Sequence, residues 1–139
     1  MLKVFLDNRG NEFLMPNLIL LFSHRLTEEQ TLDAIKSLGI ENVLEMPDEL
    51  KMKWSNIPAD IDQPDILPFT GWLDEVSEPG DYLMIQGDYF MTFHLVLWAK
   101  QHCRIPVYST TKRVSVEKQD ESSQVVKTSV FKHVIFRKY

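Results

Sequence analysis

The chain is predicted to be an α/β protein with a Rossmann-like, mostly parallel sheet flanked by helices and a C-terminal β-hairpin. Short apolar runs alternate with helical segments, which is the pattern of a parallel sheet with right-handed crossovers. Three of these runs end on polar residues: Leu18–Phe22, Tyr82–Ile85 and Ile105–Tyr108. The last quarter of the chain instead alternates apolar and polar residues around a polar loop, which is typical of a hairpin.

The 139 residues suit one domain. Residues 1–14 are predicted to be an N-terminal appendage, in which Asn8 and Gly10 favour a turn and hence a small hairpin. Residues 15–139 are predicted to form the single domain, and its C-terminal hairpin spans residues 112–139.

The first strand–helix unit has the clearest local signals. Leu18–Phe22 is short and continuously apolar, as a buried strand is. Thr27 and Gln30 have the spacing of a capping box, so a helix is expected to begin there. Gly39 is expected to end that helix. One helical face is marked by Leu32, Ile35 and Leu38.

The middle of the chain continues the alternation. A short strand is predicted at Val43–Met46, then a helix at Glu49–Trp54 capped by Asp48. Residues 59–68 are predicted to be a loop, because Pro64 and Pro68 interrupt them, and a helix follows at Phe69–Val76.

The second half is expected to supply the centre of the sheet. Asp81–Gln86 is predicted as the central strand, followed by a helix over Tyr89–Gln101 that is apolar on most sides and expected to be buried. Ile105–Tyr108 is predicted as the next strand. The hairpin arms are expected at Arg113–Lys118 and Val125–Tyr139.

Composition narrows the class of ligand. Residues 1–103 hold 7 Lys and Arg against 17 Asp and Glu, whereas residues 104–139 hold 8 against 3. A compact anion near the C-terminal quarter fits this asymmetry better than a long nucleic acid, which needs a broad basic face. Alternatively, the basic tail only offsets an acidic body.

Other classes of site find little support in the sequence. Cys103 is the single cysteine and is expected to be an inert core thiol, so no disulfide or cysteine zinc cluster is expected. The four histidines have no metal spacing, and neither a metal nor another cofactor is expected. No apolar run is long enough to span a membrane, so a cytoplasmic protein without a membrane partner is expected.

Polar residues follow three of the predicted strands, and parallel strands place such residues at one edge of the sheet. This edge would suit a phosphate-bearing ligand, because helix N-termini there offer N–H groups. The residues are Ser23, His24, Gln86, Gly87, Asp88, Ser109, Thr110 and Thr111.

Each candidate has a functional and a structural interpretation. Hydroxyls at 109–111 with Arg113 match phosphate geometry, or simply mark a polar strand exit. His24 could act as a general acid or help to cap the next helix, and Asp88 could orient a ribose or act as an N-cap. Gly87 could admit a phosphate or supply an unusual φ angle.

Two further groups of residues also have two interpretations. Trp54 could stack on a base while Ser55 and Asn56 read the base edge, or Trp54 could belong to the core. The basic C-terminal strand with Lys132 and His133 suits either a dimer interface or one wall of an anion site.

The sequence resembles a small CARF-like ring nuclease family of type III CRISPR systems, the one numbered twenty in the Csx series. The resemblance runs from about Leu18 to the C-terminus, and one departure is the bulky Tyr89–Met91 where that family tends to have small residues. The matching words are Leu21–His24, Trp54–Pro58, Gln86–Asp88, Ile105–Thr111 with Arg113, and Val130–Val134 with Phe136 and Arg137.

The resemblance implies a homodimer that binds cyclic tetra-adenylate across a two-fold axis and cleaves it without a metal, switching off antiviral signalling. Catalytic roles are then expected for His24, Asp88 and Arg113, with His133 as a less favoured proton carrier. A non-catalytic binder that sequesters the messenger is the alternative. An interaction module that uses the basic hairpin on a protein partner is a third hypothesis.

Overall fold

The computed structural model describes residues 4–6 and 8–139. The strands are β1 (Val4–Leu6), β2 (Glu12–Leu14), β3 (Leu18–Leu21), β4 (Val43–Leu44), β5 (Tyr82–Ile85), β6 (Ile105–Gln119) and β7 (Val125–Lys138). The helices are α1 (Glu28–Asp33), the π-helical η1 (Ala34–Leu38), α2 (Asp48–Ser55), α3 (Leu67–Val76) and α4 (Tyr89–Gln101).

Five strands form the main sheet in the order β4-β3-β5-β6-β7. The first four are parallel, and β7 returns antiparallel to β6. The predicted mostly parallel sheet with a C-terminal hairpin is confirmed. The chain leaves β3 toward β4 on one side and comes back to β5 on the other side, so the strand order reverses between β3 and β5.

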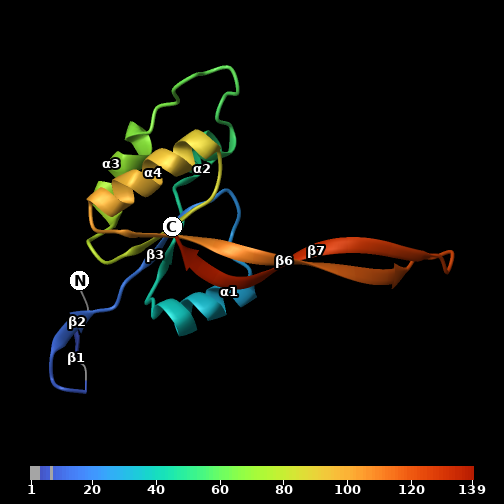
Figure 1. The fold of residues 1–139 in the computed structure, drawn as a ribbon, viewed down its shortest axis with the longest axis horizontal. Coiled ribbons are helices and arrows are strands. Elements are labelled where there is room, and N and C mark those ends of the chain that lie inside the picture. Colours follow the sequence, from blue (N-terminus) through green and yellow to red (C-terminus); the bar gives the residue numbers. More distant parts are fainter. Residues whose placement is uncertain (1–3, 7) are drawn as a thin grey trace.

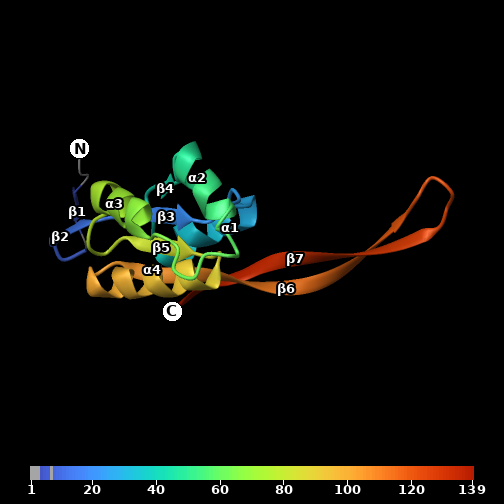
Figure 2. The same ribbon diagram turned by 90° about the horizontal axis from the view of Figure 1, so that it is seen from above.

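Helices cover both faces of this sheet (Figures 1 and 2). On one face Ile19, Leu21, Leu83 and Ile85 pack against α2, α3 and α4. On the other face Leu18, Leu20 and Met84 pack against Ala34 of η1. Successive side chains of β3 therefore enter opposite cores, which explains why this strand is apolar throughout.

The hairpin is longer than the sequence predicts. The predicted strands at Ile105–Tyr108 and Arg113–Lys118 are one continuous strand, β6, because β7 pairs with it from Val107 to Gln119. Ser109–Thr111 therefore lie within a strand and not beyond its end, which corrects the prediction. Beyond the body, residues 112–132 form a two-stranded projection, here called the arm (Figure 1).

Local signals in α1 are confirmed, but of the predicted apolar face only Leu38, in η1, packs against the core. Thr27 and Gln30 form the capping box, and Gly39 ends η1 with a left-handed φ of 65°. Gln30 and Ala34 are buried, whereas Leu32 and Ile35 are exposed. The structure further differs at α2, where Asp48 is the first helical residue and makes no side-chain cap.

Two other predictions, for α4 and for Cys103, can be compared with the structure. The outer side of α4 is not buried, since Tyr89, Phe93 and Leu97 are exposed. Cys103 is an exposed thiol with a φ of 59° in the turn after α4, so the prediction of a core thiol is wrong.

At the N-terminus, β1 and β2 pair as the expected small hairpin, although residues 1–3 and 7 of that prediction lie outside the described part. No helix among the described residues has the length and apolar character needed to span a membrane.

Candidate functional site

The carboxyl ends of β3, β5 and the body part of β6 meet at one edge of the sheet, called here the carboxyl edge. Leu21 pairs with Ile85, and Met84 pairs with Val107, so the residues that follow lie at the same level. This edge contains the three predicted polar groups, at 23–24, 86–88 and 109–111. It is also the point at which the strand order reverses, where open α/β sheets bind their ligands.

Gln86 joins β5 to β6 where the two strands separate. Its backbone N–H donates to the Leu21 carbonyl, and its side-chain Oε1 accepts from the Ser109 N–H at 2.9 Å. The Tyr139 hydroxyl donates to the Ile85 carbonyl at 2.5 Å. The Gln86 and Tyr139 side chains thus provide hydrogen-bond partners for the Ser109 N–H and the Ile85 carbonyl, which lack a strand partner where β6 continues into the arm.

Gly87 is required by packing. Its φ is not positive, but a Cβ built on it would lie 2.7 Å from the indole of Trp54. Trp54 is 4% exposed, packs edge-on against Phe69, and donates its Nε1–H to the Gln86 carbonyl at 3.1 Å. This burial favours the core interpretation of Trp54 and leaves little of its ring for a base.

Ser55 and Asn56 cap the end of α2. The Ser55 hydroxyl donates to the Lys51 carbonyl, and the Asn56 side chain donates to the Met52 carbonyl. Both residues are exposed, so further polar contacts are sterically open to them.

Asp88 is the N-cap of α4. Its carboxylate accepts from the Met91 N–H at 3.1 Å. The first amides of a helix have no carbonyl partner within it, and the helix dipole adds partial positive charge there. Tyr89, the next residue, is 94% exposed and stands at this helix start.

A buried hydrogen-bonded relay joins α1, β6 and β7 beneath the carboxyl edge. Gln30 donates its Nε2–H to Ser109 Oγ at 3.2 Å, and Ser109 Oγ lies 2.5 Å from His133 Nδ1. His133 Nε2 lies 2.6 Å from Asp33 Oδ2, and the His133 side chain is only 4% exposed. Donors and acceptors all match when the hydrogen of the His133 ring is on Nε2 and Ser109 donates to Nδ1.

Asp33 ends this relay as a stabilised carboxylate. The Ser37 hydroxyl donates to its Oδ1 at 2.6 Å. Hydrogen bonds from Ser37 and then from His133 hold the pKa of Asp33 below its ordinary value of 3.8. The relay resembles a Ser-His-Asp arrangement, but with Ser109 and His133 buried it fastens the root of the arm to α1.

Two of the predicted hydroxyls differ in their surroundings. At a bulge in β6, Thr110 Oγ1 accepts from the Ile135 N–H and donates to the Ile135 carbonyl, both at 3.1 Å. Thr110 thus completes the ladder between β6 and β7. Thr111 is exposed and faces His133 across the ladder.

The structure separates the basic candidates from the edge. Arg113 lies in the arm, four residues beyond Ser109, opposite Phe131. Lys132 also lies in the arm, opposite Lys112. Ser23 and His24 come just after β3, separated from it by Phe22, and the exposed His24 ring lies edge-on to Phe22 at 5.3 Å between centroids.

The structure adds residues that the sequence interpretation did not single out. The sequence predicts Gln30 only as part of a capping box and does not point to Asp33 or Tyr139 as site residues. The spacing of Gln30 and Asp33, one helical turn apart on α1, was the available signal for a shared face. Burial, with a contribution from Tyr108, raises the pKa of the Tyr139 hydroxyl.

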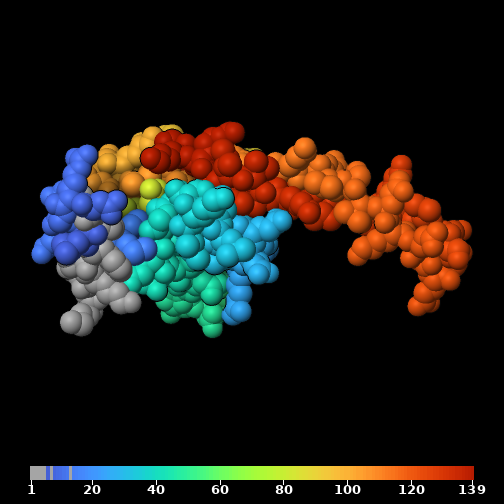
Figure 3. Space-filling view, turned by 90° about the horizontal axis from the view of Figure 1, so that it is seen from below, coloured from blue at the N-terminus to red at the C-terminus, as the bar shows by residue number. Residues whose placement is uncertain are grey.

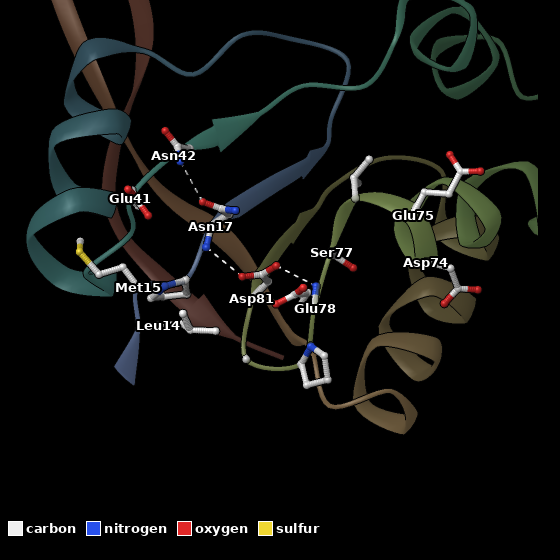
Figure 4. A pocket seen from close by; sticks show the side chains of 14 residues that line it. Leu14, Met15, Asn17, Glu41, Asn42, Asp74, Glu75, Ser77, Glu78 and Asp81 are labelled. Atoms are coloured by element: carbon white, nitrogen blue, oxygen red, sulfur yellow. Dashed lines mark hydrogen bonds between the residues drawn. The ribbon is translucent and has the colours of Figure 1, made fainter. Parts of the chain in front are cut away.

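The opposite edge of the sheet contains a cavity of about 540 Å³ (Figure 4). Among its described lining residues are five carboxylates and neither lysine nor arginine. Asp81 is buried there, and its two carboxylate oxygens accept from the N–H groups of Asn17 and Glu78, both at 2.9 Å. This lining would repel an anion.

Within the described part of the chain, no group of three or more His, Cys, Asp and Glu side chains is arranged to hold a metal ion. The candidate site therefore consists of polar side chains, one exposed histidine and the N-terminus of α4.

Comparison with known proteins identifies the family. The family described as "Uncharacterized protein MJ1673 family" matches residues 16–137. "Uncharacterized protein MJ1673" of Methanocaldococcus jannaschii is 41% identical over 127 residues, which cover 90% of this chain and 98% of that relative. No solved structure matches the chain. Neither name refers to a ring nuclease, and the chain belongs to the MJ1673 family.

Proposed function

We propose that the protein binds cyclic tetra-adenylate at the carboxyl edge and cleaves the ring without a metal ion, as a ring nuclease of type III CRISPR signalling. The reversal of strand order between β3 and β5 carries the proposal. Loops 23–24 and 86–88 start from neighbouring strands at this point, beside the start of the 13-residue helix α4. Nucleotides bind at such reversal points in open α/β sheets.

The charge distribution supports a compact anion as the ligand. The body is acidic overall, but residues 104–139 carry 8 Lys and Arg against 3 Asp and Glu. The α4 N-terminus would supply local positive potential at the edge, and the basic residues of the arm would add to it at longer range. A four-phosphate ring has two-fold symmetry, so two copies of this edge would each hold half of it.

The proposed reaction needs no water and no cofactor. A ribose 2′-oxygen attacks the adjacent phosphorus, forming the P–O2′ bond while the P–O5′ bond breaks. The 2′-hydroxyl gives up its proton, and the leaving 5′-oxygen takes one. Two such cuts turn one ring into two linear di-adenylates, each with a 2′,3′-cyclic phosphate.

The protein's part would be to align the attacking oxygen and stabilise charge on the phosphate. The α4 amides and the exposed Thr111 hydroxyl are suited to the phosphate oxygens. Exposed His24 is suited to proton transfer. His133 is a poor candidate for that role, because both of its ring nitrogens already contact Ser109 and Asp33.

One observation favours a second function, sequestration without cleavage. With His133 buried in the relay, His24 is left as the histidine exposed at this edge. A protein that only binds the ring needs no proton carrier. Its carboxyl edge would still need the α4 amides and hydroxyls.

The test is incubation of the purified protein with cyclic tetra-adenylate in excess EDTA, followed by chromatography and mass spectrometry. Linear di-adenylate with a cyclic phosphate supports the nuclease. An intact ring that is retained in equilibrium dialysis supports sequestration. An intact ring that is not retained contradicts both.

A further inference from the structure

The arm is a two-stranded ribbon with exposed apolar side chains on both faces. Phe131 and Val125 lie on one face, and the other four valines lie on the opposite face, here called the valine face. Cross-strand pairs Val114–Val130 and Val116–Thr128 lie on that face, and Val126 lies opposite Lys118. Val126 and Val130 are each 43% exposed. The arm extends away from the body in every view (Figures 1, 2 and 3), so its own body does not cover these valines.

Such a ribbon needs a covering surface. A two-stranded hairpin without a third layer is marginally stable in water. Three lysines, Lys112, Lys118 and Lys132, share the valine face, and Lys112 lies directly opposite Lys132. Like charges in directly opposed positions destabilise a ladder unless an anionic group lies nearby. A surface that is both apolar and acidic would therefore cover the valines and reduce the repulsion between the lysines.

The segment that runs from α2 to the start of α3 carries exposed side chains of both kinds. Met52, Ile61 and Leu67 are exposed by 68%, 49% and 70%. The exposed carboxylates of Asp60, Asp62 and Asp65 lie between Met52 and Leu67 in the sequence, and the segment also holds one exposed cation, Lys53. The segment 52–67 will be called the acidic loop surface, and it lies on the face of the sheet opposite α1 (Figure 1).

Pairing of two β7 edges is a less favourable way to cover the arm. β7 carries Lys127, Lys132, Arg137 and Lys138 and no acidic residue. Two such strands side by side would bring cations together, which is how edge strands avoid pairing.

We propose that the valine face of the arm docks on the acidic loop surface of a second copy of this chain. Eight residues of each strand pair from Lys112 to Gln119, giving a reach of roughly 25 Å, close to the width of a small domain. Reciprocal docking gives a closed two-fold dimer with two identical contacts. This contact forms whether or not the protein binds a nucleotide.

The experiment measures the monomer–dimer equilibrium by sedimentation velocity, without nucleotide, for the wild type and three charge-reversal sets. The arm set is Lys112→Glu, Lys118→Glu and Lys132→Glu. The loop set is Asp60→Lys, Asp62→Lys and Asp65→Lys. The control set, at the cavity on the other edge, is Asp74→Lys, Glu75→Lys and Glu78→Lys. Circular dichroism checks that each variant is folded.

The wild type is expected to dimerise, and each of the arm and loop sets is expected to weaken dimerisation about tenfold. The control set is expected to leave it unchanged. Mixing the arm-set and loop-set proteins gives a heterodimer with two attractive contacts, one wild-type and one charge-reversed, and combining both sets in one chain gives two charge-reversed contacts. Both are expected to restore dimerisation. A monomeric wild type, a dimer unaffected by either set, or reversals that do not rescue one another would overturn the proposal. Failure of ring cleavage alone would not bear on it.

Discussion

The two edges of the central sheet differ in chemistry, although the same parallel strands begin at one and end at the other. The edge at which the parallel strands begin, called here the amino edge, has the cavity of about 540 Å³, and every charged side chain among its described lining residues is a carboxylate. The carboxyl edge has polar loops, the α4 N-terminus and an exposed histidine, His24. The cavity at the amino edge is therefore unfavourable for an anion, and the carboxyl edge is where we propose that one binds.

The largest expected effect is on the rate of ring cleavage, which should fall after a substitution at the carboxyl edge and not after one at the amino edge. His24→Ala at the carboxyl edge should reduce the rate of ring cleavage by about 10²–10⁴-fold, because general acid–base catalysis typically contributes that much. Glu75→Gln at the amino edge should leave the rate unchanged. Single-turnover assays with cyclic tetra-adenylate measure both, and equal rates for the two variants would refute the role of His24.

The next effect concerns the structural role of the amino edge. Asp81→Asn should lower the free energy of unfolding by about 1.5–3 kcal/mol, because the carboxylate accepts two backbone N–H groups. An amide places its own N–H against one of them. Urea denaturation measures the loss, while nucleotide affinity should stay the same. A change in affinity without loss of stability would place ligand chemistry at this edge instead.

Two glycine-to-alanine substitutions compare a closely packed position at the carboxyl edge with an open position on a helix surface. Gly87→Ala should destabilise the fold by about 1–3 kcal/mol, because its Cβ meets the buried Trp54 indole. Gly71→Ala in α3 should instead stabilise it by about 0.5–1 kcal/mol, since nothing lies within 4 Å and alanine favours a helix. Thermal and urea unfolding of both variants test this. Equal effects would contradict the packing account.

The smallest effect is the pH dependence of the relay. The pKa of Asp33 is lowered in the folded protein, so its stabilising contribution is present above pH 3.8 and is lost as the pH falls through the lower folded value. Asp33→Asn should therefore flatten the acid limb of the stability curve by less than about 1 kcal/mol. Asp62→Asn, on the exposed loop, is the control. An unchanged acid limb in Asp33→Asn would exclude this contribution.

Local signals in the sequence predict the parts of the fold that are set by nearby residues. The apolar run at β3, the capping box of Thr27 and Gln30, and the Asp88 N-cap are all found in the structure. The grouping of the three polar clusters follows from parallel strands and is likewise confirmed by the register.

Long-range partners could not be predicted in the same way. His133 meets Asp33 across 100 residues, and nothing local to either residue indicates the other. The continuity of β6 through Thr110 depends on pairing with β7, so the predicted break after Thr111 was wrong. Leu32 and Ile35 are exposed because the helix buries its Gln30 side, where the Gln30 side chain donates to Ser109.

The most direct test of the carboxyl edge as the ligand site is the affinity for cyclic tetra-adenylate after a charge is added there. Thr111→Glu, at an exposed position, should weaken binding strongly because it places a carboxylate beside the phosphates. Glu41→Gln at the amino edge, which removes a carboxylate from the cavity, should leave binding unchanged. Isothermal titration calorimetry measures both. Undiminished binding to Thr111→Glu together with altered binding to Glu41→Gln would contradict the account.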